Sequence, residues 1–298
     1  MTNEPAVFVA VSEPGLGQRF RWAIQDTVTM TWRDLLRTRR QPEMLSFAVI
    51  MGVFFLLLFY WVFGGAIAAG AGVDYIQYLV PGIFVITTLT GAQQTGTGLA
   101  ADLAEGVTDR LRSMPMSQFA VLGGRTIADA LRNIVGVVLV AAVGYLLGFR
   151  FASVGGAVGA IALAVGVGYS FSWMNAAIAA QVKSAEMVGM LSMFWLFPLM
   201  LASTAFTPAE QMPGWLQGFA KWQPISVVSD AARDLSNGIP AGDAVVWSIV
   251  WIFVLLAIFV PMSVAIYRSC LLYTSPSPRD LVGNRVCRLL REKGGGGG

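Results

Sequence analysis

The amino-acid sequence predicts an all-α membrane protein that crosses the bilayer several times. Hydrophobic residues make up 56% of its 298 residues and charged residues only 12%, about half the charged share of an ordinary soluble domain. Several uninterrupted apolar runs reach the roughly 20 residues that a helix needs to cross ~30 Å of hydrocarbon. A membrane β-barrel would instead alternate apolar and polar residues along each strand. The polytopic helical class is therefore favoured.

The first elements precede any membrane span. We expect residues 1–17 to be disordered and residues 18–42 to form an amphipathic interfacial helix that Pro42 ends. A helix with one apolar and one basic side is typical of the head-group region of an anionic leaflet. Packing against a soluble partner is the alternative. The apolar side consists of Phe20, Ile24, Val28, Trp32 and Leu35, and the basic side of Arg19, Arg21, Arg33, Arg37, Arg39 and Arg40.

Residues 43–268 form a predicted transmembrane domain with six spans. Their approximate ranges are 44–69, 75–98, 134–149 (with a cytoplasmic lead-in from residue 119), 154–182, 187–206 and 244–267. The span 154–182 is rich in glycine and alanine, which allow helices to approach closely in lipid. In the lead-in, Asp129 and Arg132 lie three residues apart on one helical face, where they could pair.

The distribution of basic residues orients these spans. With the N-terminus inside, the interior segments hold 12 basic residues, and the exterior segments hold only Arg150, Lys221 and Arg233. Cytoplasmic loops of membrane proteins carry such an excess of Lys and Arg. Both termini are therefore expected in the cytoplasm.

The span 75–98 has a polar face in its second half. Its members, at helical spacing, are Thr87, Thr90, Gln94 and Thr97. Polar side chains at membrane depth are costly unless they meet partners or water, so this face is expected to point inward. It has two readings that can coexist: a translocation path, or hydrogen bonds that join neighbouring helices.

The interval Leu99–Asn133 is too charged to lie in hydrocarbon. Its first part has a composition that favours a short helix, which Pro115 would stop because proline has no N–H to donate. A charged helix on the cytoplasmic side of the membrane suits docking by another protein. Solvated loop charges without a partner are the alternative. The residues of interest are Asp102, Glu105, Gly106, Asp109, Arg110, Arg112 and Pro115.

An aromatic stripe precedes the last span. Trp215, Phe219 and Trp222 follow one another at helical spacing, and prolines flank the group. Tryptophan is favoured at the membrane–water interface. We expect a short outer interface helix here, which a re-entrant pair of helices could extend into the membrane.

The segment 269–298 differs in composition from everything before it. It resembles a translated sequencing adapter followed by a glycine run and is expected to be non-native. The alternative is a flexible basic tail. Both cysteines, Cys270 and Cys287, lie within it. Residues 1–269 hold 15 basic and 15 acidic residues, so their net charge gives no indication of nucleic-acid binding.

The sequence offers little catalytic chemistry. It contains no histidine, and outside the tail it contains no cysteine, so we expect no catalytic residue, metal site or cofactor. No GxxxxGK[ST] phosphate-binding loop occurs, so P-loop ATP hydrolysis is not expected. No carboxylate occurs between Glu43 and Asp74 or between Asp129 and Glu186, which disfavours a proton-coupled transporter. Energy for any transport must then come from another polypeptide.

Several stretches together resemble the permease subunits of ABC-2 type transporters, and among them the daunorubicin-resistance-type (DrrB-like) permeases of actinobacteria. They are RTRRQPE before the first span, YIQYLVPGIF in the second, the loop EGVTDRLRSMPMSQFAVLGGR and the segment FTPAEQMPGWLQGFAKWQPISVVSDAARDL. The resemblance covers about residues 15–268.

This resemblance implies a permease that exports an amphiphilic drug or lipid-like compound across a bacterial plasma membrane. It also implies a type V-like exporter fold, a second permease copy or paralogue, and a separate ATPase subunit that docks on a coupling helix at Asp102–Pro115. Export of a polysaccharide or glycolipid is the alternative within the family. A passive channel or structural membrane protein remains open, and a lipid-modifying enzyme is disfavoured by the missing histidine and cysteine.

Overall fold

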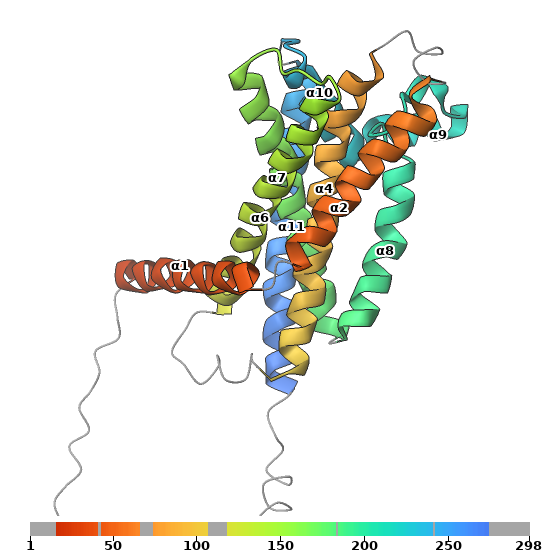
Figure 1. Ribbon diagram of the computed structural model, residues 1–298. Coiled ribbons are helices and arrows are strands. Elements are labelled where there is room, and N and C mark those ends of the chain that lie inside the picture. The colour runs from red at the N-terminus through yellow and green to blue at the C-terminus, as the bar shows by residue number, and fades with distance from the viewer. Residues whose placement is uncertain are drawn as a thin grey trace, which may run out of the picture.

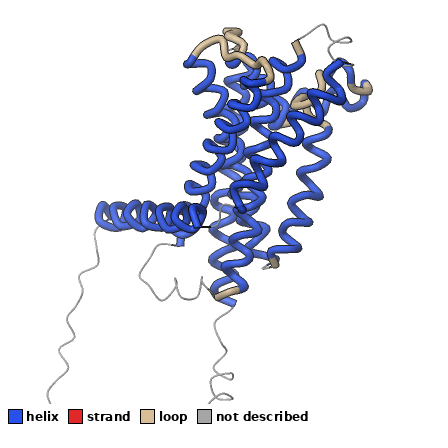
Figure 2. Tube along the Cα trace, viewed as in Figure 1, coloured by secondary structure: helices blue, strands red, loops and turns tan. Residues whose placement is uncertain are grey.

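The computed structural model describes residues 16–40, 43–65, 74–106, 118–182, 184–240 and 242–273. Helices dominate these ranges, and no strand occurs among them (Figure 2). The fold class predicted from composition, an all-α polytopic membrane protein, is confirmed. The helices are α1 (Leu16–Arg40), α2 (Glu43–Leu58, continued by the π-helical turn Phe59–Phe63), α4 (Tyr75–Ala104), α6 (Gln118–Leu146), α7 (Val154–Val182), α8 (Ala185–Leu201), α9 (Gly214–Trp222), α10 (Pro224–Ser236) and α11 (Asp243–Tyr273).

The long helices run side by side as a bundle, and α1 projects sideways from it, roughly perpendicular to the long helices (Figure 1). The helices α9 and α10 lie at the end of the bundle away from α1. Among the described residues, four helices are long and apolar enough to cross a membrane: α4, α6, α7 and α11. Two shorter apolar helices, Val49–Phe63 and Ala185–Leu201, run beside them.

Helix α4 is the centre of the bundle. It contacts α2, α6, α7, α8 and α10, and 83% of its most apolar window is buried. The window of α11 has a higher mean hydropathy, 2.8 against 1.3, yet only 11% of it is buried. In water such a helix would be the first to be buried, so its exposed apolar surface indicates contact with lipid.

Glycines of α7 let neighbouring backbones come close. A side chain at Gly156 would collide with the Leu235 carbonyl of α10, and one at Gly168 would collide with Thr88 of α4. At Gly166 a Cβ atom would lie 3.0 Å from Ile252 of α11. The prediction that the small residues of this span serve packing is confirmed at these positions.

Several boundaries differ from those predicted. Helix α1 begins at Leu16, two residues earlier than expected, and residues 1–15 of the expected disordered segment lie outside the described residues. Helix α4 continues six residues beyond the predicted end at residue 98, because its charged last turn is paired with other helices. Helix α11 continues to Tyr273, so the first residues of the expected non-native tail are helical, and residues 274–298 lie outside the described residues.

Candidate functional site: two polar clusters and a membrane cavity

The first polar cluster joins α1 to the end of α4. Asp102 in the last turn of α4 is 4% exposed and accepts a hydrogen bond of 2.6 Å from Arg37 of α1. Its second carboxylate oxygen accepts a hydrogen bond from Arg125 of α6. The hydrogen bond to Asp102 raises the pKa of the Arg37 guanidinium. Asp102 thus joins three helices, α1, α4 and α6.

A second ion pair extends this cluster along α6. Asp129 pairs with Arg132, as their spacing predicted, and accepts a hydrogen bond from the Thr95 hydroxyl of α4. Arg132 also donates a hydrogen bond of 2.9 Å to the Thr38 hydroxyl of α1. Thus α1 is held to the bundle by directional contacts, whereas Ile24, Val28 and Trp32 of its predicted apolar side are 49%, 62% and 64% exposed.

The close crossing of α1 and α6 is made possible by Gly124. The Thr31 hydroxyl donates a hydrogen bond of 3.1 Å to the Gly124 carbonyl. A side chain at Gly124 would meet the α1 backbone at the Thr27 carbonyl, 2.9 Å away. A small residue is therefore required where α1 crosses the lead-in of α6.

The residues predicted to receive a partner do not all share one environment. Asp102 is buried in the ion pairs described above, so its carboxylate is already occupied. Glu105 ends α4 and is exposed, and Gly106 follows in the left-handed conformation with φ of +69°. The remaining four candidates lie outside the described residues: Asp109, Arg110, Arg112 and Pro115.

The predicted polar face of α4 divides between two neighbours. Thr87 is 1% exposed and lies against Gly52 of α2, where any side chain would collide with its hydroxyl. Thr90 instead lines a cavity, and Thr97 lies beside Gly189 of α8. Gln94 is partly buried, and its carbonyl accepts a hydrogen bond of 3.3 Å from the Thr97 hydroxyl.

The cavity next to Thr90 lies between α2, α4 and α8 and has a volume of about 320 Å³. Thr90 and Gln93 supply its polar groups. Gln93 was not identified from the sequence, although Thr90, Gln93 and Thr97 also follow helical spacing. The other lining residues are Met51, Phe54, Phe55, Gly189, Met193, Leu196, Phe197 and Met200. Methionine and phenylalanine walls with few polar groups suit an apolar or amphiphilic molecule.

At the opposite end of the bundle, Arg233 of α10 holds α4 and the end of α8 together. Its Nε donates to the Tyr78 carbonyl at 3.0 Å, and its Nη2 donates to the Thr204 carbonyl at 3.0 Å. Its guanidinium pairs with Asp230 and lies 3.6 Å from the centre of the Tyr78 ring. The sequence indicated Arg233 only as an exterior charge, although its i,i+3 spacing from Asp230 is a signal of pairing.

The predicted outer interface helix corresponds to α9. Its three aromatic side chains are largely exposed: 81% for Trp215, 52% for Phe219 and 63% for Trp222. Exposed indoles at the end of a bundle suit the membrane–water interface. Within the described part of the chain, no group of three His, Cys, Asp or Glu residues is placed to hold a metal ion.

Comparisons with known proteins agree with this arrangement. The ABC-2 type transporter family matches residues 25–236. The daunorubicin resistance ABC transporter permease protein DrrB1 of Streptomyces coeruleorubidus is 35% identical, over 83% of this chain and 87% of that protein. The probable doxorubicin resistance ABC transporter permease protein DrrC of Mycobacterium tuberculosis is 26% identical, over 80% and 86%. A putative transport permease, ycf38, of Cyanophora paradoxa is 24% identical, over 71% and 74%.

Proposed function

We propose, because the chain belongs to the ABC-2 type transporter family, that it is the membrane-spanning permease subunit of an ABC exporter whose cargo is an amphiphilic compound. The proposed class of cargo rests on the cavity between α2, α4 and α8, where apolar walls surround the polar groups of Thr90 and Gln93. An amphiphile can satisfy both kinds of surface at once. Two relatives whose names refer to daunorubicin or doxorubicin resistance support a drug-like cargo.

The energy for export comes, in this proposal, from ATP hydrolysed by a separate subunit. The sequence has no P-loop of its own. The docking surface begins at the exposed Glu105 and continues through the charged residues up to Pro115. Asp102 has a different role, because it fixes α1 and α6 to the same end of α4. A movement of the loop after α4 would therefore displace α1, α4 and α6 together.

A second permease, either another copy of this chain or a paralogue, completes the exporter in this proposal. The complex lies in a bacterial plasma membrane, with six spans and both chain termini in the cytoplasm. The basic residues gathered on the α1 side support this orientation. Cysteines introduced at Ser113 and Gln217 test it: a membrane-impermeant thiol reagent added outside intact cells should label only the Gln217→Cys variant. Equal labelling of both variants would contradict the topology.

The function itself is tested by ATP hydrolysis. The permease and its partner ATPase are reconstituted together in nanodiscs, and hydrolysis is measured with and without an amphiphilic dye such as rhodamine 6G. We expect the dye to stimulate hydrolysis only when the permease is present. A rate that is independent of both the permease and every amphiphile tried would contradict the proposal.

A further inference from the structure

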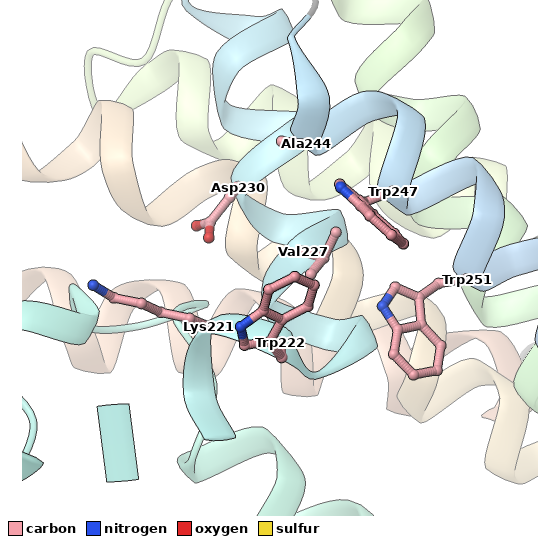
Figure 3. Close-up of a pocket in the computed structure, with 7 residues that line it drawn as sticks. All are labelled: Lys221, Trp222, Val227, Asp230, Ala244, Trp247 and Trp251. Atoms are coloured by element: carbon pink, nitrogen blue, oxygen red, sulfur yellow. The ribbon is translucent and has the colours of Figure 1, made fainter. Parts of the chain in front are cut away.

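A second cavity, of about 330 Å³, lies between α9, α10 and α11 at the outer end of the bundle. It is distinct from the cavity beside Thr90, because the two share no lining residue. Figure 3 shows its lining, in which three indoles lie to one side of the Asp230 carboxylate. The residues that line it are Lys221, Trp222, Val227, Asp230, Ala244, Trp247 and Trp251.

Two helices contribute the aromatic walls. Trp222 ends α9, whereas Trp247 and Trp251 lie one turn apart near the start of α11. The rings of Trp222 and Trp247 are 5.8 Å apart and meet edge to face at 77°. Trp222 and Trp247 remain 63% and 47% exposed, so this wall is open to a ligand. The face of an indole carries negative electrostatic potential and attracts a cation more strongly than any other aromatic side chain does.

The charges around the cavity favour the same kind of ligand. Asp230 lines it with a side chain that is 39% exposed. Oδ1 of Asp230 accepts hydrogen bonds from Thr204 and Arg233, while Oδ2 has no hydrogen-bond partner within the described ranges. Arg233 does not line the cavity, and its guanidinium is held against the Tyr78 ring. Asp230 therefore adds negative charge at the edge of the cavity, a charge that it already shares with Arg233.

The cation that does line the cavity is neutralised elsewhere. Lys221 pairs with Glu210 at 3.2 Å, and in Figure 3 its side chain extends away from the indoles. A hydrogen bond from its own backbone, together with the hydrogen bond from Lys221, holds the pKa of Glu210 below its usual range. Glu210 thus remains charged and offsets part of the charge that Lys221 brings to the cavity.

The position of the cavity indicates that the ligand also has an apolar part. The cavity opens beside the first turns of α11, where Val246 is 61% exposed and Val250 is 41% exposed. This surface belongs to the helix whose apolar side faces lipid. A molecule that reaches the cavity from the outer leaflet would have its tail along α11 and its head group among the indoles.

We propose that this cavity is an outer-leaflet binding site for a cationic amphiphile, whose ammonium group contacts Trp222, Trp247 and Trp251, with the Asp230 carboxylate at the edge of the cavity. The inference rests on the proposed export function only in placing this ligand on the exit side of the cargo route. Binding itself depends on the cavity alone. The ammonium group could belong to an exported compound or to a lipid such as phosphatidylcholine.

The test uses the full-length permease in nanodiscs, without ATPase or nucleotide, and the probe 4-phenylbutyl-trimethylammonium. Its control is the uncharged isostere in which carbon replaces nitrogen. Isothermal titration calorimetry should show that the cation binds at least roughly tenfold more tightly than the isostere. Each of Trp247→Leu and Trp251→Leu should weaken cation binding roughly 2- to 30-fold, the range expected for loss of one cation–π contact.

A matched control comes from the same surface. Trp215 is 81% exposed on α9 and does not line the cavity, so Trp215→Leu should leave binding unchanged. Asp230→Asn should weaken binding as well, but this substitution also disturbs the contacts of Asp230 with Thr204 and Arg233. The test of the binding site therefore rests on the tryptophan variants. Equal affinity for cation and isostere, or an equal loss in Trp215→Leu, would overturn the proposal.

Two membrane compositions identify the source of the ammonium group. In phosphatidylglycerol nanodiscs the probe should bind, and added phosphatidylcholine would displace it only if a lipid head group is the natural occupant. Probe binding without ATP-driven transport would overturn the proposed function and leave the site intact. Transport without probe binding would overturn the site and leave the function intact.

Discussion

Replacing Asp102 with alanine should destabilise the permease more than any surface substitution. The substitution removes the carboxylate shared by Arg37 and Arg125. The Arg125 side chain is 13% exposed, so it would be left charged and mostly buried, a loss that costs about 3–5 kcal/mol. The Arg37 side chain is 38% exposed and can turn to water, which adds less than about 1 kcal/mol. The expected total is about 3–6 kcal/mol.

Equilibrium unfolding in mixed micelles of increasing SDS content measures this cost. The matched control is Glu210→Ala, which breaks an ion pair whose side chains are 71% and 52% exposed. That change should cost less than about 1 kcal/mol. Arg37→Ala should resemble the control, because it leaves the Arg125–Asp102 pair in place. The reasoning is refuted if Asp102→Ala and Glu210→Ala have the same free energy of unfolding within error.

Three further predictions concern packing, cargo and coupling. Gly156→Ala should lower the free energy of unfolding by about 1–3 kcal/mol, the cost of overpacking, because the new methyl group collides with the Leu235 carbonyl. Gly155→Ala places its methyl group in open space and should leave the free energy of unfolding unchanged. Equal costs for the two variants would contradict the packing. Thr90→Trp should fill the cavity beside α8 and slow dye transport in vesicles at least tenfold while basal ATP hydrolysis persists; unchanged transport would exclude the cavity from the path. Glu105→Lys combined with Arg110→Glu should leave the permease in the membrane but reduce co-purification of the ATPase; normal recovery would contradict the docking assignment.

Periodicity and composition predicted the helices and their character well. The apolar run lengths predicted the long apolar helices α4, α6, α7 and α11, and the periodic apolar and basic residues predicted α1. The i,i+3 spacing predicted the Asp129–Arg132 pair, because residues on one helical face are neighbours whatever the fold. These features depend only on residues that are close together in the sequence, so they can be predicted without knowing the fold.

Contacts between distant helices were not predictable in the same way. Arg37 and Asp102 are 65 residues apart, and only the packing of α1 against the bundle brings them together. Periodicity grouped Thr87, Thr90, Gln94 and Thr97 on one face of α4, but it cannot say which helix covers each residue. Thr87 therefore meets Gly52, while Thr90 meets a cavity. For the same reason, the contacts of Arg233 and of the α11 indoles were not predicted, because their partners lie on other helices.

Transport in sealed vesicles tests the central claim most directly. Inside-out vesicles that contain the permease, its ATPase or both are given rhodamine 6G, and its accumulation is followed by fluorescence quenching. We expect accumulation only with both subunits and ATP, and none with a non-hydrolysable ATP analogue. Accumulation by the permease alone, equal with and without ATP, would show a passive channel and contradict the assignment as an exporter subunit.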